Sequence, residues 1–378
     1  MVILYVVLKN SFCLILLLFF MKIPPYKVDY TWVKTKTEDK KEYDLADPAM
    51  RRLYFNSKVG EEIQKLQQYL KNNSFIAYFL APKMAGKGTY TAMLREVLGE
   101  DLIEHISVGD IVRKYHKEFE EKGQNSNVYN YMKENYRGFL DLEKVFEALV
   151  CRDTKSVSVP TEFVLSLVKM EIDVLGARTI FLDGFPRKID QISYSLYFRD
   201  LINHREDTDL FLLINLPMEI INQRIKSRMI CPECQTSRNL NLAPTTKVGC
   251  EGDDCYYLIC DNPSCKEVRM VCKEGDELGI ENIKERIIDD IKLMEQARNM
   301  YGIEKIEIYN SLSKEKALDY VDDYELTKEY SFEKDKDGNV KKIEKPFSIK
   351  DNGKEYISLL PAPALIQLIK QLVVKLGL

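Results

Sequence analysis

Residues 76–92 read Ile-Ala-Tyr-Phe-Leu-Ala-Pro-Lys-Met-Ala-Gly-Lys-Gly-Thr-Tyr-Thr-Ala. The apolar first part predicts a buried strand, and the tight loop after it opens a helix over 90–98. In this arrangement backbone N–H groups point at anionic oxygens, a lysine reaches the terminal phosphates and a hydroxyl faces Mg²⁺. The stretch therefore predicts a phosphate loop for a nucleoside triphosphate. The residues expected to hold the phosphates are Ala85, Gly86, Lys87, Gly88, Thr89 and Tyr90.

The loop departs from the usual pattern at its start. A complete Walker A loop begins with glycine, whereas this chain has Ala81 there. The alternative interpretation is a lysine-bearing turn that only closes a strand–helix unit.

Further apolar strands recur along the chain. They are expected at 103–108, 179–182, 210–216 and 305–309, and helical segments alternate with them. Continuous apolar strands alternating with helices are typical of a parallel sheet covered on both faces, with its ligand at the carboxyl ends of the strands. We therefore expect an α/β fold, a P-loop three-layer sandwich with a five-stranded parallel sheet.

Composition excludes some function classes. With 378 residues and 45% hydrophobic content, the chain is long enough for one sizeable core and small satellite domains. The formal charge is -4, and the 55 basic and 59 acidic residues are interspersed, so no nucleic-acid partner is expected.

The first 21 residues carry one charge, Lys9, and an apolar run at 12–20. Three interpretations compete: a membrane anchor, an export signal, and an incorrect start with Met21 as the true first residue. We favour Met21, so a membrane partner is expected only if residues 1–20 are a real anchor.

The remaining segments flank the sheet. Residues 26–47 read as a charged, irregular arm, and 49–72 as a helix beside the sheet. Turns at Asp337-Gly338 and Asn352-Gly353 predict hairpins within 330–357. The amphipathic helix expected at 363–376 is interpreted as core packing in preference to partner binding.

Four more motifs follow the phosphate loop in order. They are Ile-Ser-Val-Gly-Asp-Ile-Val-Arg at 106–113, Val-Pro-Thr-Glu at 159–162, Phe-Leu-Asp-Gly-Phe-Pro-Arg at 181–187 with Gln191, and a helix carrying Arg224 and Arg228. Together they resemble the adenylate kinase (nucleoside monophosphate kinase) family, whose strings read close to GxPGxGKGT, STGDxxR, DGFPRxxxQ and RIxxR. The resemblance covers roughly residues 74–309.

The resemblance implies roles for the matching residues. Lys87 would span the β- and γ-phosphates, Thr89 would face Mg²⁺, and Asp183 would hold the metal through its water shell. Arg113 and Arg187 would clamp the acceptor monophosphate with bidentate forks, and Gln191 would read its base. Arg224 and Arg228, at the root of a mobile insert, would close over the transferring group, and Arg286 would bind phosphate. The other expected nucleotide contacts are Ser107, Gly109, Val159, Gly184 and Lys273, the last standing where the family has arginine.

These arginines and lysines suit phosphoryl transfer. The reaction depends on charge neutralisation, alignment of the phosphates and exclusion of water more than on covalent catalysis. The loop departs from the family pattern at three positions: Ala81 replaces the first glycine, Lys83 replaces proline and Met84 replaces the second glycine. We therefore expect the approach of the backbone to the phosphates to be altered, and Lys83 adds a charge. Val108 replaces the threonine of adenine-selecting members and offers no hydroxyl to the acceptor base. The resemblance thus supports kinase activity more firmly than a preference for adenine.

Seven of the nine cysteines crowd into 231–272. Such a cluster in an α/β chain indicates a metal site in a reducing compartment, here the cytoplasm. Cys231, Cys234, Cys260 and Cys265 would form a closed Cys₄ shell for a structural Zn²⁺ in a ribbon-like lid. Cys250 and Cys255 are the alternative second pair, with a separation from Cys234 nearer that of the family's zinc-bearing lids. Free or redox thiols are the metal-free interpretation, and Cys272 is expected to pack.

The expected organisation is an extension (1–73), a kinase core (74–113, 156–229 and 277–315), an enlarged acceptor-binding insertion (114–155), a zinc lid (230–276) and a C-terminal region (316–378). The expected reaction is ATP plus AMP giving two ADP, with Mg²⁺, in a monomer. The alternatives are a CMP or UMP kinase, and a non-catalytic nucleotide- or RNA-binding protein with a zinc ribbon.

Overall fold

The structure is a computed structural model, and it describes residues 26–38, 41–150, 159–188, 191, 201–202, 204–252, 255–273, 275–335 and 338–378. The interpretations of residues 1–21 therefore lie outside the described residues. Within these ranges, no helix combines the length and the apolar character that a bilayer-spanning helix needs.

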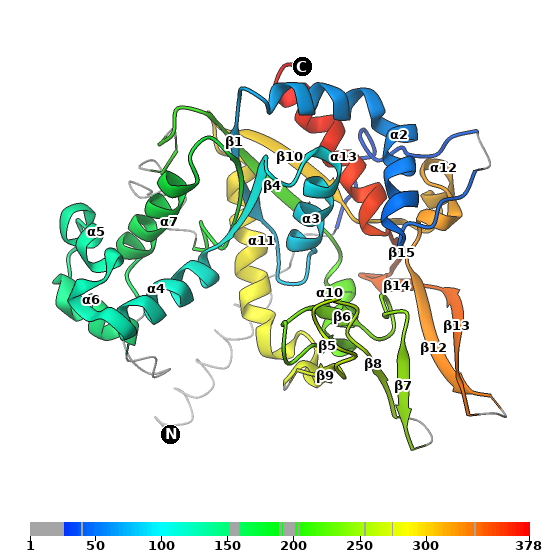
Figure 1. The fold of residues 1–378 in the computed structure, drawn as a ribbon. Coiled ribbons are helices and arrows are strands. Elements are labelled where there is room, and N and C mark those ends of the chain that lie inside the picture. The colour runs from blue at the N-terminus through cyan, green and yellow to red at the C-terminus, as the bar shows by residue number, and fades with distance from the viewer. Residues whose placement is uncertain are drawn as a thin grey trace, which may run out of the picture.

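The centre of the fold is a five-stranded parallel sheet in the order β10-β4-β1-β3-β2 (Figure 1), which confirms the predicted fold class. Every residue of β1 is buried, because helices cover both faces. The second strand ends one residue earlier than predicted, since Val108 already begins a helix. The strands are β1 (Phe75–Leu80), β2 (Ile103–Ser107), β3 (Thr179–Asp183), β4 (Thr208–Asn215) and β10 (Glu304–Tyr309).

Two helical layers enclose this sheet. On one face α2 (Pro48–Tyr69), α3 (Lys87–Leu98), α10 (Met218–Lys226) and α13 (Pro361–Lys375) bury their apolar residues against Phe79 and Leu212. On the other face α4 (Val108–Lys122), α7 (Thr161–Leu175) and α11 (Lys284–Arg298) pack on Ile76 and Tyr78. The alternation of strand side chains between the two clusters follows the period-two geometry of a strand.

The last helix, α13, belongs to the core. It contacts β10, α2 and α3, and Leu365, Ile366, Ile369 and Leu372 are fully buried. The predicted core packing of this helix is therefore confirmed.

Residues 311–359 form an inserted segment between β10 and α13. Its two ends meet, because β11 (Ser311–Ser313) pairs with β15 (Lys354–Ser358) and the Leu359 N–H donates to the Asn310 carbonyl at 2.8 Å. We call these residues the insertion. The predicted hairpins lie within it, and Asn352 and Gly353 join β14 to β15 with positive φ of 48° and 77°. Its other elements are α12 (Ala317–Tyr320), η4 (Asp323–Glu325), β12 (Lys328–Lys334), β13 (Val340–Pro346) and β14 (Ser348–Asp351).

The polar stretch after β2 is helical, as predicted. It contains α4, η1 (Gly123–Asn125), α5 (Asn127–Asn135) and α6 (Leu142–Val150). A small aromatic core holds these helices on α7, with the Phe119 and Phe146 ring centroids 4.2 Å apart and those of Phe146 and Phe163 5.2 Å apart.

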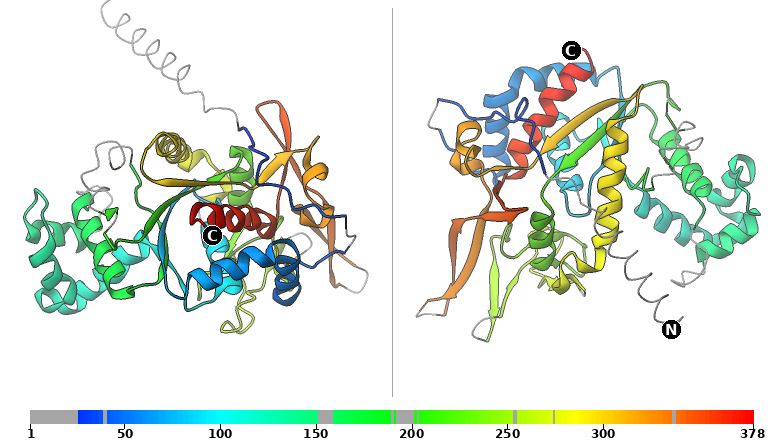
Figure 2. Two further views of the ribbon diagram at one scale, coloured as in Figure 1. Left: turned by 90° about the horizontal axis from the view of Figure 1, so that it is seen from above. Right: turned by 180° about the vertical axis from the view of Figure 1, so that it is seen from behind.

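The cysteine-rich segment, residues 230–276, is called the lid below. It follows α10 and consists of two small sheets around Met229, Leu258 and Met270. Figure 2 shows its β7–β8 hairpin beside the β12–β13 hairpin of the insertion. The elements here are β5 (Arg228–Ile230), β6 (Ser237–Asn239), β7 (Val248–Glu251), β8 (Cys255–Leu258), β9 (Val271–Cys272), η2 (Asp276–Leu278) and, after the lid, η3 (Glu281–Ile283).

Candidate functional site

The predicted phosphate loop lies between β1 and α3, at the carboxyl end of the sheet. The helix begins at Lys87, three residues earlier than predicted, so the N–H groups at its first turn lack intrahelical partners. Met84 and Gly86 both have positive φ, 66° and 101°. Met84 thus adopts the left-handed conformation, which glycine adopts without strain, at a cost of about 1 kcal/mol.

Lys87 and Asp183 meet at the centre of the site. The Lys87 Nζ lies 3.1 Å from Asp183 Oδ1 and donates to the Ala81 carbonyl at 3.1 Å. Asp183 ends β3, the neighbour of β1, so the parallel sheet itself brings the two residues together. Gly184 follows with φ of 92°, and a Cβ there would lie 3.4 Å from the Val108 Cβ.

Cations from four separate segments converge on this point. Partial burial lowers the pKa of Lys83, and so do the neighbouring charges of Arg228, Lys273 and Arg286. Burial also lowers the pKa of Arg187, with Arg286 as the next cause. Like charges held this close repel one another unless an anion lies between them.

Two aspartates that the sequence analysis missed partly balance these charges. Asp290 faces Lys87, Arg187 and Arg286, although burial is the stronger effect and raises the pKa of its carboxyl. It stands four residues after Arg286 on α11, a spacing that could have revealed it. Asp276 binds Arg228 with both oxygens, at 2.5 and 2.7 Å, and both side chains are largely buried. No local signal pointed to that pair, because 48 residues separate its partners.

Arg224 lies beneath the loop. Its Nη1 donates to the Met84 carbonyl at 3.0 Å. With the Asn310 amide oriented to satisfy its neighbours, the amide oxygen accepts from both terminal nitrogens of Arg224, at 3.1 and 3.2 Å. Burial lowers the pKa of Arg224. In this arrangement Arg224 supports the loop backbone, while Arg228 contacts the Met84 sulfur at 3.4 Å.

The expected acceptor residues form a second corner, at the ends of β2 and β3. Arg113 is exposed and pairs with Asp110 on its own helix, so the structure does not bring it onto the Lys87–Asp183 centre. A Cβ on Gly109 would lie 3.4 Å from Arg113 Nη1 and 3.7 Å from the Ser107 Oγ, so the three residues are adjacent.

The side-chain amide of Gln191 is hydrogen-bonded to other residues of the chain. Its side-chain oxygen accepts from the Arg187 and Lys188 N–H groups at 2.7 and 3.1 Å, and its nitrogen donates to the Thr161 Oγ1 at 3.0 Å. This ties the segment that carries Arg187 to the start of α7, which follows Val159.

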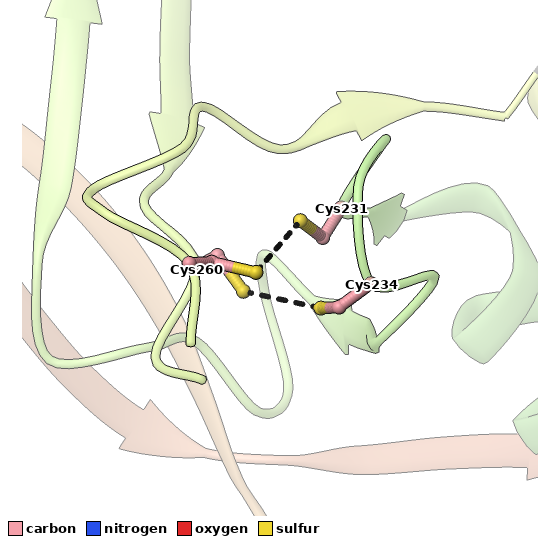
Figure 3. A group of neighbouring side chains, drawn as sticks. Cys231, Cys234 and Cys260 are labelled. Atoms are coloured by element: carbon pink, nitrogen blue, oxygen red, sulfur yellow. Dashed lines mark hydrogen bonds between the residues drawn. The ribbon is translucent and has the colours of Figure 1, made fainter. Parts of the chain in front are cut away.

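The four cysteines Cys231, Cys234, Cys260 and Cys265 lie together, with their sulfurs within 4.8 Å of one another. The Cys231 and Cys265 sulfurs are 3.9 Å apart, and those of Cys234 and Cys260 3.6 Å apart (Figure 3). Four thiolates around Zn²⁺ at 2.3 Å would have sulfurs ~3.8 Å apart. The set therefore fits a tetrahedral zinc ion.

The alternative pair does not join this cluster. In the β7–β8 hairpin Cys250 is opposite Tyr256, and Glu251 is opposite Cys255. Successive side chains of a strand alternate between faces, so Cys250 and Cys255 point to opposite faces of the ribbon. Cys272 is exposed on β9, so the expectation that it packs was wrong. It lies in a two-residue edge strand with both residues exposed.

Comparison with curated proteins finds relatives named adenylate kinase. The protein from Thermotoga petrophila is 32% identical over 191 residues, which cover 50% of this chain and 74% of the relative. The protein from Clostridium acetobutylicum is 30% identical over 209 residues, or 55% of this chain and 78% of the relative. No family model matches the chain.

Proposed function

Because this chain belongs to the adenylate kinase family, we propose that it transfers the γ-phosphoryl group of Mg²⁺·ATP to AMP and forms two ADP. Family membership makes it a phosphotransferase of the nucleoside monophosphate kinase type. In the reaction, an oxygen of the acceptor phosphate forms a bond to the γ-phosphorus. The bond from that phosphorus to the β–γ bridging oxygen breaks, and the electron pair stays on ADP.

One observation carries the proposal. Lys87 and Arg187 lie close to Asp183. Arg286 acts electrostatically on Arg187 and on Lys83, and Arg228 and Lys273 act on Lys83 as well. Distant parts of the chain thus supply one group of cations at the carboxyl edge of the sheet. Two facing polyphosphates are the ligand that such a cluster fits, because they neutralise the mutual repulsion of the cations.

Each residue has a task in this proposal. Lys87 would bridge the β- and γ-phosphates once nucleotide displaces its contact with Asp183. Arg187 and Arg286 would bind oxygens of the transferring and acceptor phosphates, and Arg228 would close the site from the root of the lid. Arg113, with Ser107 and Gly109 beside it, would bind the acceptor phosphate from α4.

The residues present also suit Mg²⁺. Thr89 is exposed in the first turn of α3, and the Asp183 carboxylate lies beside Lys87 at the end of the neighbouring strand. A hydroxyl and a carboxylate are oxygen ligands that Mg²⁺ accepts directly or through water. The ion, when bound, would neutralise charge on the β- and γ-phosphates.

We assign Cys231, Cys234, Cys260 and Cys265 to a structural zinc ion. With four protein ligands no coordination position is left for a reacting water. The ion would cross-link the two cysteine pairs of the lid, whose own core is small. Reduced thiols and a supply of ATP are both found in the cytoplasm, where we propose that the protein works as a monomer.

A pyrimidine monophosphate is the second candidate acceptor. Val108 lies against Gly184 at the acceptor corner and presents no hydroxyl to a base. The Gln191 amide already bonds to Thr161 and to two backbone N–H groups, so reading a base would require it to exchange these partners. Both observations weaken the case for adenine selection without affecting the phosphate chemistry.

The test is phosphoryl transfer from Mg²⁺·ATP to each common nucleoside monophosphate, with product diphosphates separated by anion exchange. We expect AMP to be the best acceptor. High turnover on CMP or UMP, with none on AMP, would show that the acceptor is a pyrimidine monophosphate instead.

Lys87→Met should lower kcat by about 10²- to 10³-fold. The exposed Lys71→Met serves as the matched control. An unchanged rate in Lys87→Met would show that this lysine is not part of the chemistry, whereas no transfer to any acceptor would leave a nucleotide-binding protein that is not a kinase.

A further inference from the structure

The β12–β13 hairpin of the insertion projects from the body of the protein beside the lid. Of its strand residues, none is fully buried, so the hairpin has no core of its own. Isolated two-stranded hairpins are marginally stable in water. Its position therefore depends on what it contacts.

Its contacts are with the lid. The Tyr330 N–H donates to the Asn241 carbonyl at 2.7 Å, and the Asn241 side-chain amide donates to the Tyr330 carbonyl at 3.1 Å. Further along, the rings of Tyr256 and Phe332 lie 5.6 Å apart. Near the tip the Lys334 ammonium donates to the Gly252 carbonyl. The β13 strand contacts β7, and Figures 1 and 2 show the two hairpins side by side.

The contacted turn of the lid is in turn bonded to the helix that carries Arg224. The Asn239 side-chain nitrogen donates to the Arg224 carbonyl at 2.9 Å, and its oxygen accepts from the Asn241 and Leu242 N–H groups at 3.0 and 2.8 Å. The Leu240 N–H donates to the Ser227 carbonyl at 2.8 Å. A continuous series of hydrogen bonds therefore joins the insertion, the lid turn and the end of α10.

Repulsion between the lid and the phosphate loop gives this series of hydrogen bonds a function. In the described arrangement Lys273 of the lid and Arg228 at its root face Lys83 of the phosphate loop and Arg286 of α11. Asp276, which is paired with Arg228, offsets part of this charge. Without a polyanion the remaining positive charge is repulsive, which favours movement of the lid away from the loop. The contacts between the β12–β13 hairpin and the lid oppose that movement.

We infer that the β12–β13 hairpin is an intramolecular clasp that positions the lid over the phosphate site before nucleotide binds. The inference rests on the proposed function for its consequence, and on the hydrogen bonds and the ring contact between hairpin and lid for its geometry. The clasp residues are Asn241 and Tyr256 on the lid, with Tyr330, Phe332 and Lys334 on the insertion. They position other groups and do not touch substrate.

Two variants open the clasp. The first is the double substitution Asn241→Ala with Phe332→Ala, which removes one hydrogen bond and the ring contact. The second replaces residues 332–342 by Asn-Gly, which shortens the hairpin and keeps Tyr330. Lys341→Ala is the matched control, because Lys341 is exposed on the same hairpin. Three quantities are measured: the Kd for Mg²⁺·ADP by calorimetry, the steady-state KM and kcat, and hydrogen exchange of the lid amides.

If the clasp positions the lid, a smaller fraction of the opened variants is competent to bind. The Kd and KM should then rise about 3- to 10-fold, kcat should stay equal or increase, and the lid amides should exchange faster, with the control unchanged. Unaltered Kd and lid exchange in both variants would overturn the inference, and so would a lower Tm as the only effect. If the parent protein makes no ADP from ATP and AMP, the proposed function fails, whereas the Kd and exchange data still test the clasp.

Discussion

Lys83 lies near three other cations, because the charges of Arg228, Lys273 and Arg286 act on its ammonium, and Asp276 offsets part of their effect. In the absence of nucleotide this proximity is unfavourable, and burial and the three cations together lower the pKa of Lys83. In the proposed function a bound polyphosphate would turn the same four charges into favourable contacts. Lys83 would then give up some stability of the free protein in exchange for nucleotide binding.

We predict that Lys83→Met raises the KM for ATP about 10-fold and changes kcat little, because a charge that contacts ground state and transition state alike contributes uniform binding. The Tm of the free variant should be equal or higher. Steady-state kinetics and thermal unfolding measure the two effects, with the exposed Lys71→Met as control. An unchanged KM would show that Lys83 does not face the phosphates.

Single side chains also show how far sequence reasoning reached. Lys87, Asp183, Arg187 and Arg228 were predicted from motifs, and the meeting of Lys87 with Asp183 follows from the parallel pairing of β1 and β3. Asp276 could not be predicted, because its pairing with Arg228 depends on the path of the whole lid.

At the scale of elements, the lid depends on its cysteines. The small apolar core there includes Cys231, Cys260 and Cys265 themselves, together with Met229, Leu258 and Met270. A segment with so little apolar burial needs a further link between its strands, and a Cys₄ zinc ion would provide one.

We predict that Cys260→Ser lowers the zinc content from about one ion per chain toward none, because a three-cysteine shell binds more weakly, and that it lowers the Tm. Cys255→Ser, on the exposed hairpin, should keep both at the parent values. Native mass spectrometry gives the stoichiometry. Loss of zinc in Cys255→Ser with retention in Cys260→Ser would assign the site to the other pair.

The insertion is the element that the sequence described least well. Its turns predicted hairpins, and the helix after it was recognised as a core helix, but residues 316–359 had no predicted location. Their placement depends on pairing between Ser311 and Ser358, which are far apart in sequence. Local patterns carry no information about such a closure.

Over the whole molecule, the arm, α2 and the insertion meet at one buried carboxyl group. Glu325 accepts from the Thr35 hydroxyl at 2.6 Å and the Tyr54 hydroxyl at 2.5 Å. Lys58 lies close by and pairs with Asp322 at 3.1 Å. Burial nevertheless raises the pKa of Glu325 above its ordinary value.

A carboxyl group with a raised pKa binds its proton more tightly in the folded state than in the unfolded chain. Its contribution to stability is therefore fully present below the ordinary carboxyl pKa of about 4.3 and is lost as pH rises through the folded-state pKa. We predict that the free energy of unfolding of the parent, relative to Glu325→Gln, falls with rising pH across that window. Urea unfolding at a series of pH values measures it. A difference that is constant or grows with pH would contradict the raised pKa.

In the proposed function, cations from the phosphate loop, the segment after β3, the lid root and α11 bind one pair of facing phosphate chains. The most direct measurement is a crystal structure with Mg²⁺ and ADP at both nucleotide positions. We expect phosphate oxygens within hydrogen-bond distance of Lys87, Arg187, Arg228 and Arg286 in a single cleft. Nucleotide bound elsewhere, or phosphates that contact Lys87 while the three arginines point to solvent, would contradict it.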